Sequence, residues 1–275
     1  MILGANVSIA GGFDKCIDRA LALGSNCLMT FASSPRSLQT KALPPDIIKK
    51  YLDKKTQSGM GPHFFHAPYL VNLASESRSY LTASTNTLVF YQQTAGAVGA
   101  VGTIFHLGTS KGLSPAQTLS QIVEAINYIL DSSPKGIRLV LENAAGQSGS
   151  VGADLNQLGQ IISRVGDRSK IGVCLDTQHL FAAGIALDIA LNKFDKVVGL
   201  KHLVAVHVND SKTEFASHVD RHANLGTGKI GLENLKKFIT DPRINHLPFI
   251  LEVPGDGQSG PRKIDVDALK SLLVK

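Results

Sequence analysis

The sequence predicts a single α/β domain over residues 1–275, folded as a closed (β/α)8 (TIM) barrel. Eight short apolar runs rich in strand-forming residues alternate with eight segments of helical periodicity. The 275 residues show no linker or break in composition, and one barrel of this class takes about 250 residues. A doubly wound open sheet is the alternative. It would carry a Gly-rich phosphate-binding turn after the first strand, which Gly4, Gly11 and Gly12 do not form.

The predicted strands are short runs in which apolar side chains dominate, bounded by glycine, proline or polar residues. Runs that are apolar almost throughout are typical of a parallel sheet covered on both faces. In chain order, we expect the strands at residues 2–9, 27–31, 63–66, 103–107, 137–142, 171–176, 203–208 and 247–253.

The predicted helices have apolar residues three and four positions apart, with recognisable start and stop residues. Gly24 stops the first helix, and Pro45 opens the second. Ser114 followed by Pro115 caps the fourth. In chain order, we expect the helices at residues 13–23, 44–58, 77–99, 114–129, 154–165, 187–198, 232–240 and 266–273, with polar loops at 32–41 and 209–228.

Composition limits the class of protein. With 43% hydrophobic residues the chain can form a sizeable core, but it has no apolar stretch long enough for a transmembrane helix. Residues 1–4 form the start of a strand without a basic segment, so we expect no signal peptide. The cysteines, Cys16, Cys27 and Cys174, are odd in number and widely spaced, which favours core residues of a cytoplasmic, reducing environment over disulfides. The net charge of +6 suits a polyanionic partner.

Metal-ligand residue types stand at the ends of six predicted strands or in the loops that follow them. Function in a barrel lies at the C-terminal ends of the strands, so these side chains are expected to converge. Five of the nine histidines of the protein belong to the set. Its nine members are His66, His106, Glu142, Asp176, His179, His207, Asp220, His222 and Glu252.

Any one of these residues alone would more often be a hydrogen-bonded structural residue or a helix cap. Four carboxylates in one apolar-walled cup, however, would repel one another and could not all ionise without cations. Mixed histidine and carboxylate ligands suit Zn²⁺, with Mn²⁺ or Fe²⁺ as alternatives. Three divalent ions would raise the formal charge from +6 to +12, which favours a nucleic acid as partner.

The strand order of a barrel predicts how the ligands divide, because strands adjacent in sequence are adjacent in space. Glu142 is expected to bridge two ions. The three expected groups are His66, His106 and Glu142; Glu142, Asp176, His207 and Glu252; and His179, Asp220 and His222.

Longer motifs run in order along essentially the whole chain and are specific enough to make chance a poor explanation. They are GANVS at 4–8 with GG at 11–12, HAPYLVNL at 66–73, ENAAGQ at 142–147, DTQH at 176–179 with FAAG at 181–184, HVNDSK at 207–212, DRH at 220–222 with LG at 225–226, and LEVP at 251–254. Through these motifs the chain resembles the endonuclease IV family of apurinic/apyrimidinic (AP) endonucleases. Asn6 departs from the family, which usually has histidine there, as do Gln178 and the order Ser148-Gly149, but no ligand is lost.

This resemblance implies a DNA-repair enzyme, a zinc-dependent deoxyribonuclease IV with three zinc ions held by the nine residues above. It implies hydrolysis of the phosphodiester 5′ to an AP site in duplex DNA, leaving a 3′-hydroxyl and a 5′-deoxyribose phosphate. We assign catalysis to Glu142, as the bridging ligand, and to Glu252, as the carboxylate that orients the attacking water.

The resemblance also implies DNA contacts by Arg36, Tyr69 and Leu70, since an abasic nucleotide is reached by bending the duplex and flipping the nucleotide out. From the residues alone, Arg36 would equally be a solvated loop charge, and Tyr69 with Leu70 would pack the lid of the barrel. A barrel of this length needs no second subunit, so we expect a monomer.

The strongest rival function is a single-metal sugar isomerase or epimerase of the same barrel superfamily. Such an enzyme would use Glu142, Asp176, His207 and Glu252 and leave the other five ligands without a role. A third class, a catalytically inactive DNA- or metal-binding barrel, is disfavoured by the intact ligand set. The number of bound ions separates the first two classes: one for the isomerase, three for the nuclease.

Overall fold

Eight parallel strands close into a barrel in the computed structural model of the protein, which describes residues 1–273. The predicted TIM barrel is therefore confirmed. Strands that follow one another in sequence pair side by side, and the first closes the ring against the last. The barrel strands are β1 (Ile2–Asn6), β2 (Cys27–Thr30), β3 (His63–His66), β4 (Gly102–His106), β5 (Arg138–Glu142), β6 (Ile171–Asp176), β7 (Leu203–His207) and β10 (Pro248–Leu251).

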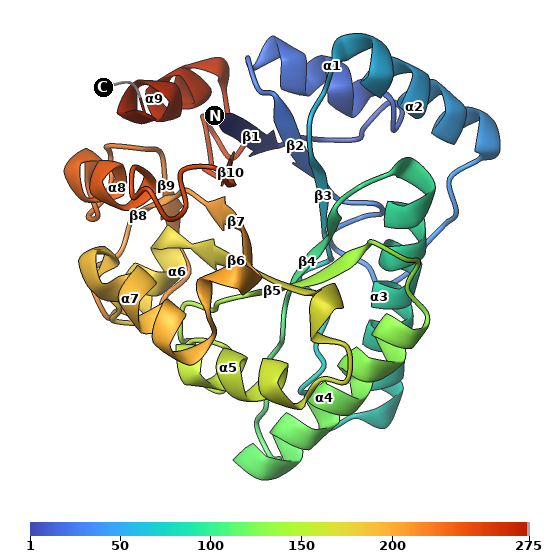
Figure 1. The fold of residues 1–275 in the computed structure, drawn as a ribbon, viewed down its shortest axis with the longest axis vertical. Coiled ribbons are helices and arrows are strands. Elements are labelled where there is room, and N and C mark those ends of the chain that lie inside the picture. Colours follow the sequence, from blue (N-terminus) through green and yellow to red (C-terminus); the bar gives the residue numbers. More distant parts are fainter. Residues whose placement is uncertain (274–275) are drawn as a thin grey trace.

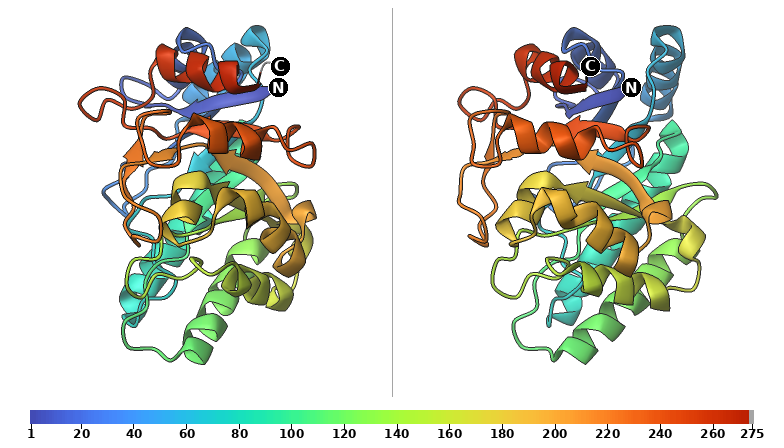
Figure 2. Two further views of the ribbon diagram at one scale, coloured as in Figure 1. Left: turned by 90° about the vertical axis from the view of Figure 1, so that its left-hand side faces the viewer. Right: turned by 60° about the vertical axis from the view of Figure 1, so that its left-hand side comes forward.

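Helices surround the strands (Figure 1). They are α1 (Lys15–Ala22), α2 (Pro45–Ser58), α3 (Arg78–Val98), α4 (Pro115–Asp131), α5 (Leu155–Arg164), α6 (Thr177–Ala182), α7 (Leu187–Val197), α8 (Leu232–Ile239) and α9 (Lys263–Leu273), with 3₁₀ turns η1 (Arg168–Lys170) and η2 (Leu200–His202). The last helix, α9, packs beside β1, which brings the two ends of the described chain together (Figure 2). None of the helices within residues 1–273 combines the length and the apolar composition needed to cross a membrane.

Two apolar layers hold the barrel together. The larger fills the space between strands and helices and includes Leu139 and Leu141 of β5. The smaller fills the inside of the barrel, where space is short. A Cβ atom on Gly4 would lie only 2.4 Å from Cys27 Sγ, so β1 needs glycine at this position. The inner layer consists of Cys27, Met29, Phe64, Ile104, Val140, Cys174, Ala205 and Ile250.

The alternation of side chains along each strand determines which residues point inward at the C-terminal end of the barrel. Successive side chains of a strand alternate between its faces, so the residue two positions after an inner-layer residue also points inward. On β5, Val140 is in the inner layer and Glu142 therefore faces the barrel axis. The same step leads from the inner layer to Phe31, His66, His106, Asp176, His207 and Glu252. On β1, it leads from Gly4 to Asn6.

Several element boundaries differ from the prediction. The first strand, predicted over 2–9, ends at Asn6 because the chain turns at Gly12, whose N–H bonds to Ile9 O. The last barrel strand ends at Leu251, one residue before Glu252. The loop predicted at 209–228 contains a short antiparallel pair, β8 (Asp210–Ser211) and β9 (His222–Ala223), and α6 was not predicted separately. These pieces are too short to produce a periodic pattern.

Candidate metal centre

The nine predicted ligands meet at the C-terminal end of the barrel. Eight of them form three groups whose donor atoms lie within 4.8 Å of one another inside each group, and the ninth, Asp220, pairs with two histidines of the third group. The groups are His66, His106 and Glu142; Glu142, Asp176, His207 and Glu252; and Asp176, His179 and His222. Glu142 belongs to two groups, as expected, and Asp176 also belongs to two.

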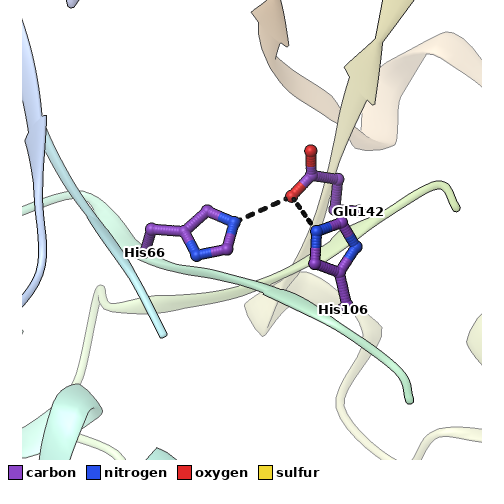
Figure 3. Close-up of side chains that lie close together, drawn as sticks. All are labelled: His66, His106 and Glu142. Atoms are coloured by element: carbon purple, nitrogen blue, oxygen red, sulfur yellow. Dashed lines mark hydrogen bonds and ion pairs between the residues drawn. The ribbon is translucent and has the colours of Figure 1, made fainter. Parts of the chain in front are cut away.

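The first group joins three neighbouring strands through one carboxylate. His66 Nε2 lies 3.0 Å and His106 Nε2 3.5 Å from Oε2 of Glu142 (Figure 3). β5 pairs with β4 so that Glu142 stands directly beside His106. Both rings therefore point at the same oxygen atom from adjacent strands.

The second group is centred on His207. Its Nδ1 atom lies 2.9 Å from Oε1 of Glu142, 2.9 Å from Oε2 of Glu252 and 3.9 Å from Oδ2 of Asp176. His207, Glu142 and Asp176 are fully buried. Three carboxylates around one buried imidazole nitrogen need positive charge, either as protons or as cations.

The third group lies on the loop side. The Nε2 atoms of His179 and His222 approach to 3.4 Å, and the Asp220 carboxylate lies 3.3 Å from each of them. His222 Nε2 is also 3.8 Å from Oδ2 of Asp176.

Three of the imidazoles are oriented by backbone carbonyls. The Nδ1 atom of His66 donates to Ala67 O at 2.7 Å, that of His179 donates to Asn143 O at 3.0 Å, and that of His222 lies 3.3 Å from Glu252 O. Each bond fixes the tautomer and leaves the Nε2 lone pair facing the carboxylates. Metal-ligating histidines are usually held in this way.

Two asparagines that the sequence did not single out as site residues lock the strand ends together. Asn143 Oδ1 accepts from Asp176 N at 2.7 Å, and its carbonyl holds His179. Asn209 Nδ2 donates to Oδ2 of Asp176 at 2.6 Å, while its Oδ1 accepts from Glu252 N at 2.9 Å. The ends of β5, β6, β7 and β10 are therefore joined by side chains beneath the donor atoms. The only sequence signal for this role was the position of each asparagine directly after a strand.

Asp210 shapes the loop that carries His222. This buried carboxylate accepts N–H groups from Gly226, Gly228 and Ile230 at 2.9–3.1 Å. A Cβ on Gly228 would lie 2.5 Å from Asp210 Oδ1, so a larger residue would disrupt this network. An acidic residue followed by a glycine-rich segment is the sequence feature that could have revealed it.

The carboxylates set the charge of the third group when no cation is bound. Burial alone would lower the pKa of His179, but Asp176 and Asp220 outweigh it and raise that pKa to about 10. The same balance of burial against these two carboxylates raises the pKa of His222 to about 9. At neutral pH these two rings therefore hold protons that a metal ion would displace.

His63 is a structural histidine of the barrel and contrasts with the candidate ligands. Both ring nitrogens of His63 are occupied, one by Thr30 Oγ1 at 2.9 Å and the other by Tyr51 Oη at 2.8 Å. Burial lowers its pKa to about 3. The imidazoles of the three groups instead face carboxylates. Their oriented nitrogens and these carboxylates together fit divalent metal ions.

Two adjoining clefts open onto these groups. The larger, of about 620 Å³, and the smaller, of about 230 Å³, share Tyr69, His106, His179 and Asp220 in their walls. Tyr69 is 60% exposed and packs edge-on against Phe31. An exposed aromatic ring beside a polar cleft is available for a ligand.

The remaining DNA contacts predicted from the resemblance are less central. Leu70 is exposed and lines the larger cleft. Arg36 is exposed in the loop between β2 and α2 and is not part of the wall of either cleft. Lys212 and Arg221, by contrast, line the smaller cleft and place positive charge beside the metal groups.

Comparison with known proteins agrees with the fold. Residues 17–272 match a family model described as a xylose isomerase-like TIM barrel. The chain is 38% identical over 260 residues, 92% of its length and 94% of the relative's, to a probable endonuclease 4 of Halothermothrix orenii. It also matches the crystal structure of endonuclease IV from Thermus thermophilus, with a TM-score of 0.86, 32% identity and coverage of 99% and 97%. A D-tagatose 3-epimerase-like protein shares the fold at a TM-score of 0.76 and 18% identity, covering 99% and 97% of the two chains.

Proposed function

Because the chain belongs to the endonuclease IV family, we propose that it cuts duplex DNA at AP sites, hydrolysing the phosphodiester on the 5′ side of the lesion. The products would be a 3′-hydroxyl and a 5′-deoxyribose phosphate. The observation that carries this proposal is the third group of ligands, because a barrel that needs one metal ion has no use for His179, Asp220 and His222.

We assign three zinc ions to the centre, with Mn²⁺ or Fe²⁺ as alternatives. His66, His106 and Glu142 would hold the first, and Glu142, Asp176, His207 and Glu252 the second. Asp176, His179, Asp220 and His222 would hold the third. When bound, such ions supply Lewis-acid charge and lower the pKa of a coordinated water towards neutrality.

The protein's own residues prepare the attack. Glu252 is held from both sides, with Oε2 2.9 Å from His207 Nδ1 and Oε1 accepting from Asn6 Nδ2 at 3.3 Å. Because it also lines the smaller cleft, its carboxylate would orient the attacking water and take up its proton. Glu142 keeps the first two groups in register.

Residues at the rim select the substrate. Tyr69 and Leu70 would fill the space left in the base stack when the abasic nucleotide is turned out of the duplex. Lys212 and Arg221 would pair with phosphates next to the lesion, and Arg36 would contact the backbone further away.

Incision of a 5′-labelled duplex with one tetrahydrofuran abasic analogue tests the proposal. This analogue resists β-elimination, so only hydrolysis can cut it. We expect one cut on its 5′ side, an extendable 3′-hydroxyl, and loss of cutting with a chelator. A freshly zinc-loaded protein that leaves the duplex intact would refute the proposal.

The rival single-metal epimerase rests on the second group, which alone contains the residues such an enzyme would use: Glu142, Asp176, His207 and Glu252. Metal analysis separates the two functions, since one ion per chain favours the epimerase and three favour the nuclease. Turnover of ketose sugars or their phosphates would be the matching activity assay.

A further inference from the structure

A pocket of about 510 Å³ lies at the opposite end of the barrel from the metal groups. It is bounded by the first residues of β5 and β6, by α5 and the end of α7, and by the 3₁₀ turns η1 and η2. Sites that hold small ligands typically have about 300–1,000 Å³. In barrels of this class, chemistry takes place at the other face. A ligand bound here would therefore not be the substrate of the metal centre.

The charged groups in this pocket all have the same sign. Arg138, Arg168 and Lys201 line it, and no aspartate or glutamate among residues 1–273 does. Within residues 1–273, none of the three forms an ion pair, whereas Arg243 and Arg262 are each paired with neighbouring carboxylates. Three cationic side chains around one recess without a counter-charge repel one another and favour an anion between them.

His202 adds a buried polar group to the same wall. It is only 9% exposed and lies directly before β7, and Ile171 at the start of β6 lines the same pocket. Burial lowers the pKa of His202, and the charges of Lys201, Arg138 and Arg168 lower it further. An anion that neutralises these positive charges is therefore expected to raise the pKa of His202.

The remaining lining suits an organic group. Ile162, Val197 and Val198 form an apolar wall between the cationic side chains. The guanidinium of Arg168 donates to Ser163 O, which anchors it at the rim while leaving further N–H groups available.

We propose that this pocket binds a small phosphate-bearing molecule of about nucleotide size. Arg138, Arg168 and Lys201 contact the phosphate oxygens, and the apolar wall receives the organic part. Guanidinium groups match the geometry of phosphate oxygens and can bond to them in pairs. The site is separate from the metal centre and does not depend on the proposed nuclease activity.

Nuclear magnetic resonance of the metal-loaded full-length protein tests this site. Inorganic phosphate and adenosine 5′-monophosphate are titrated separately, and the backbone amides of Ser169, Ile171 and His202 are followed. We expect saturable shifts of these amides with at least the nucleotide, and a rise in the pKa of His202 when the ligand is bound. Shifts with phosphate alone would identify the free anion as sufficient.

The double variant Arg168→Gln/Lys201→Gln separates this site from phosphate binding at the metal centre. Both side chains are exposed, so the fold is expected to remain intact. The dissociation constant should rise about a hundredfold, since each of the two lost charged contacts weakens binding by roughly tenfold. Incision of abasic DNA should not change.

The matched control is Lys193→Gln/Lys236→Gln, which removes two exposed charges outside the pocket and should leave binding unchanged. The proposal is overturned if neither ligand shifts these amides saturably. Equal dissociation constants in the wild type and in Arg168→Gln/Lys201→Gln would also overturn it.

Discussion

The Nε2 atoms of His179 and His222 lie 3.4 Å apart, although His179 belongs to α6 and His222 to β9. The Nδ1 atom of His179 donates to a carbonyl, and that of His222 faces another, so two lone pairs face each other. Such an arrangement is unfavourable unless a proton or a cation lies between the rings. With Asp220 3.3 Å from both rings, the pair becomes a ligand site at neutral pH only by exchanging protons for metal.

Replacing one ring of this pair should remove one ion. We expect His222→Gln to bind about one zinc ion fewer per chain than the wild type and to cut abasic DNA at least about a hundredfold more slowly. Metal content by mass spectrometry and single-turnover incision are the measurements. His246→Gln is the control, since His246 is exposed and lies before β10, at the end of that strand opposite the metal groups. Full metal content and wild-type turnover in His222→Gln would contradict the assignment.

Removing the charge of either catalytic carboxylate, Glu142 or Glu252, should stop catalysis without unfolding the barrel. Glu142→Gln and Glu252→Gln are each expected to lower turnover by at least about 10³-fold, or about 4 kcal/mol of barrier. Circular dichroism should show an intact fold. Glu233→Gln is the isosteric control because Glu233 lies at the surface in an ion pair with Lys237. Wild-type-like turnover in either site variant would refute the catalytic assignment.

The protein without metal should have its own pH profile of stability. The pKa values of His179 and His222 are raised from 6.5 to about 10 and about 9, so their stabilising pairs are complete below pH 6.5 and are lost as the pH rises through 9–10. His207 lowers the pKa of Glu252, against the effect of burial, from 4.5 to about 2, so that contribution is complete above pH 4.5 and is lost as the pH falls through about 2.

We therefore expect the melting temperature of chelated protein to be highest near pH 4.5–6.5 and to fall from there towards pH 10. Metal loading requires deprotonated ligands, so its stabilising effect should grow over the same alkaline range. Thermal melts of chelated and zinc-loaded protein at a series of pH values measure both. A gap between the two melting temperatures that narrows from pH 6.5 to 9 would contradict this view of the centre.

The barrel and the ligands at strand ends could be predicted because both follow from local pattern. Apolar runs predict the strands. A side chain two positions beyond an inner-layer residue must face the barrel axis, as Val140 and Glu142 show. The β8–β9 pair could not be predicted, since it depends on the bonds of Asp210 to the backbone twenty residues further on. Asp220 was assigned to the site from its place in the loop after the seventh strand, although a loop has no periodicity that would orient its side chain.

The aromatic ring at the cleft mouth should act on DNA and not on the metal centre. Tyr69→Ala is expected to weaken binding of abasic duplex by about tenfold, the loss typical of one stacking contact, with zinc content unchanged. Fluorescence anisotropy with labelled abasic and intact duplexes measures the effect. Tyr128→Ala, which removes an exposed tyrosine from α4, is the control. Unchanged affinity in Tyr69→Ala would remove this residue from the interface.

The contact between Asn6 and Glu252 joins residues from opposite ends of the sequence and exists only because the barrel closes β1 against β10. The amide of Asn6 donates to Glu252 Oε1 at 3.3 Å, which fixes the oxygen that does not face His207. Asn6 is therefore expected to position the carboxylate without binding metal.

Asn6→Leu removes this donor at nearly constant volume. We expect kcat to fall at least about tenfold, because a hydrogen bond to a charged group contributes about 1.5–3 kcal/mol, while KM and zinc content stay unchanged. Asn6→His supplies a donor again and should keep kcat within about threefold of the wild type. Loss of zinc in Asn6→Leu would instead indicate a structural role, and an unchanged kcat would show that Glu252 needs no such support.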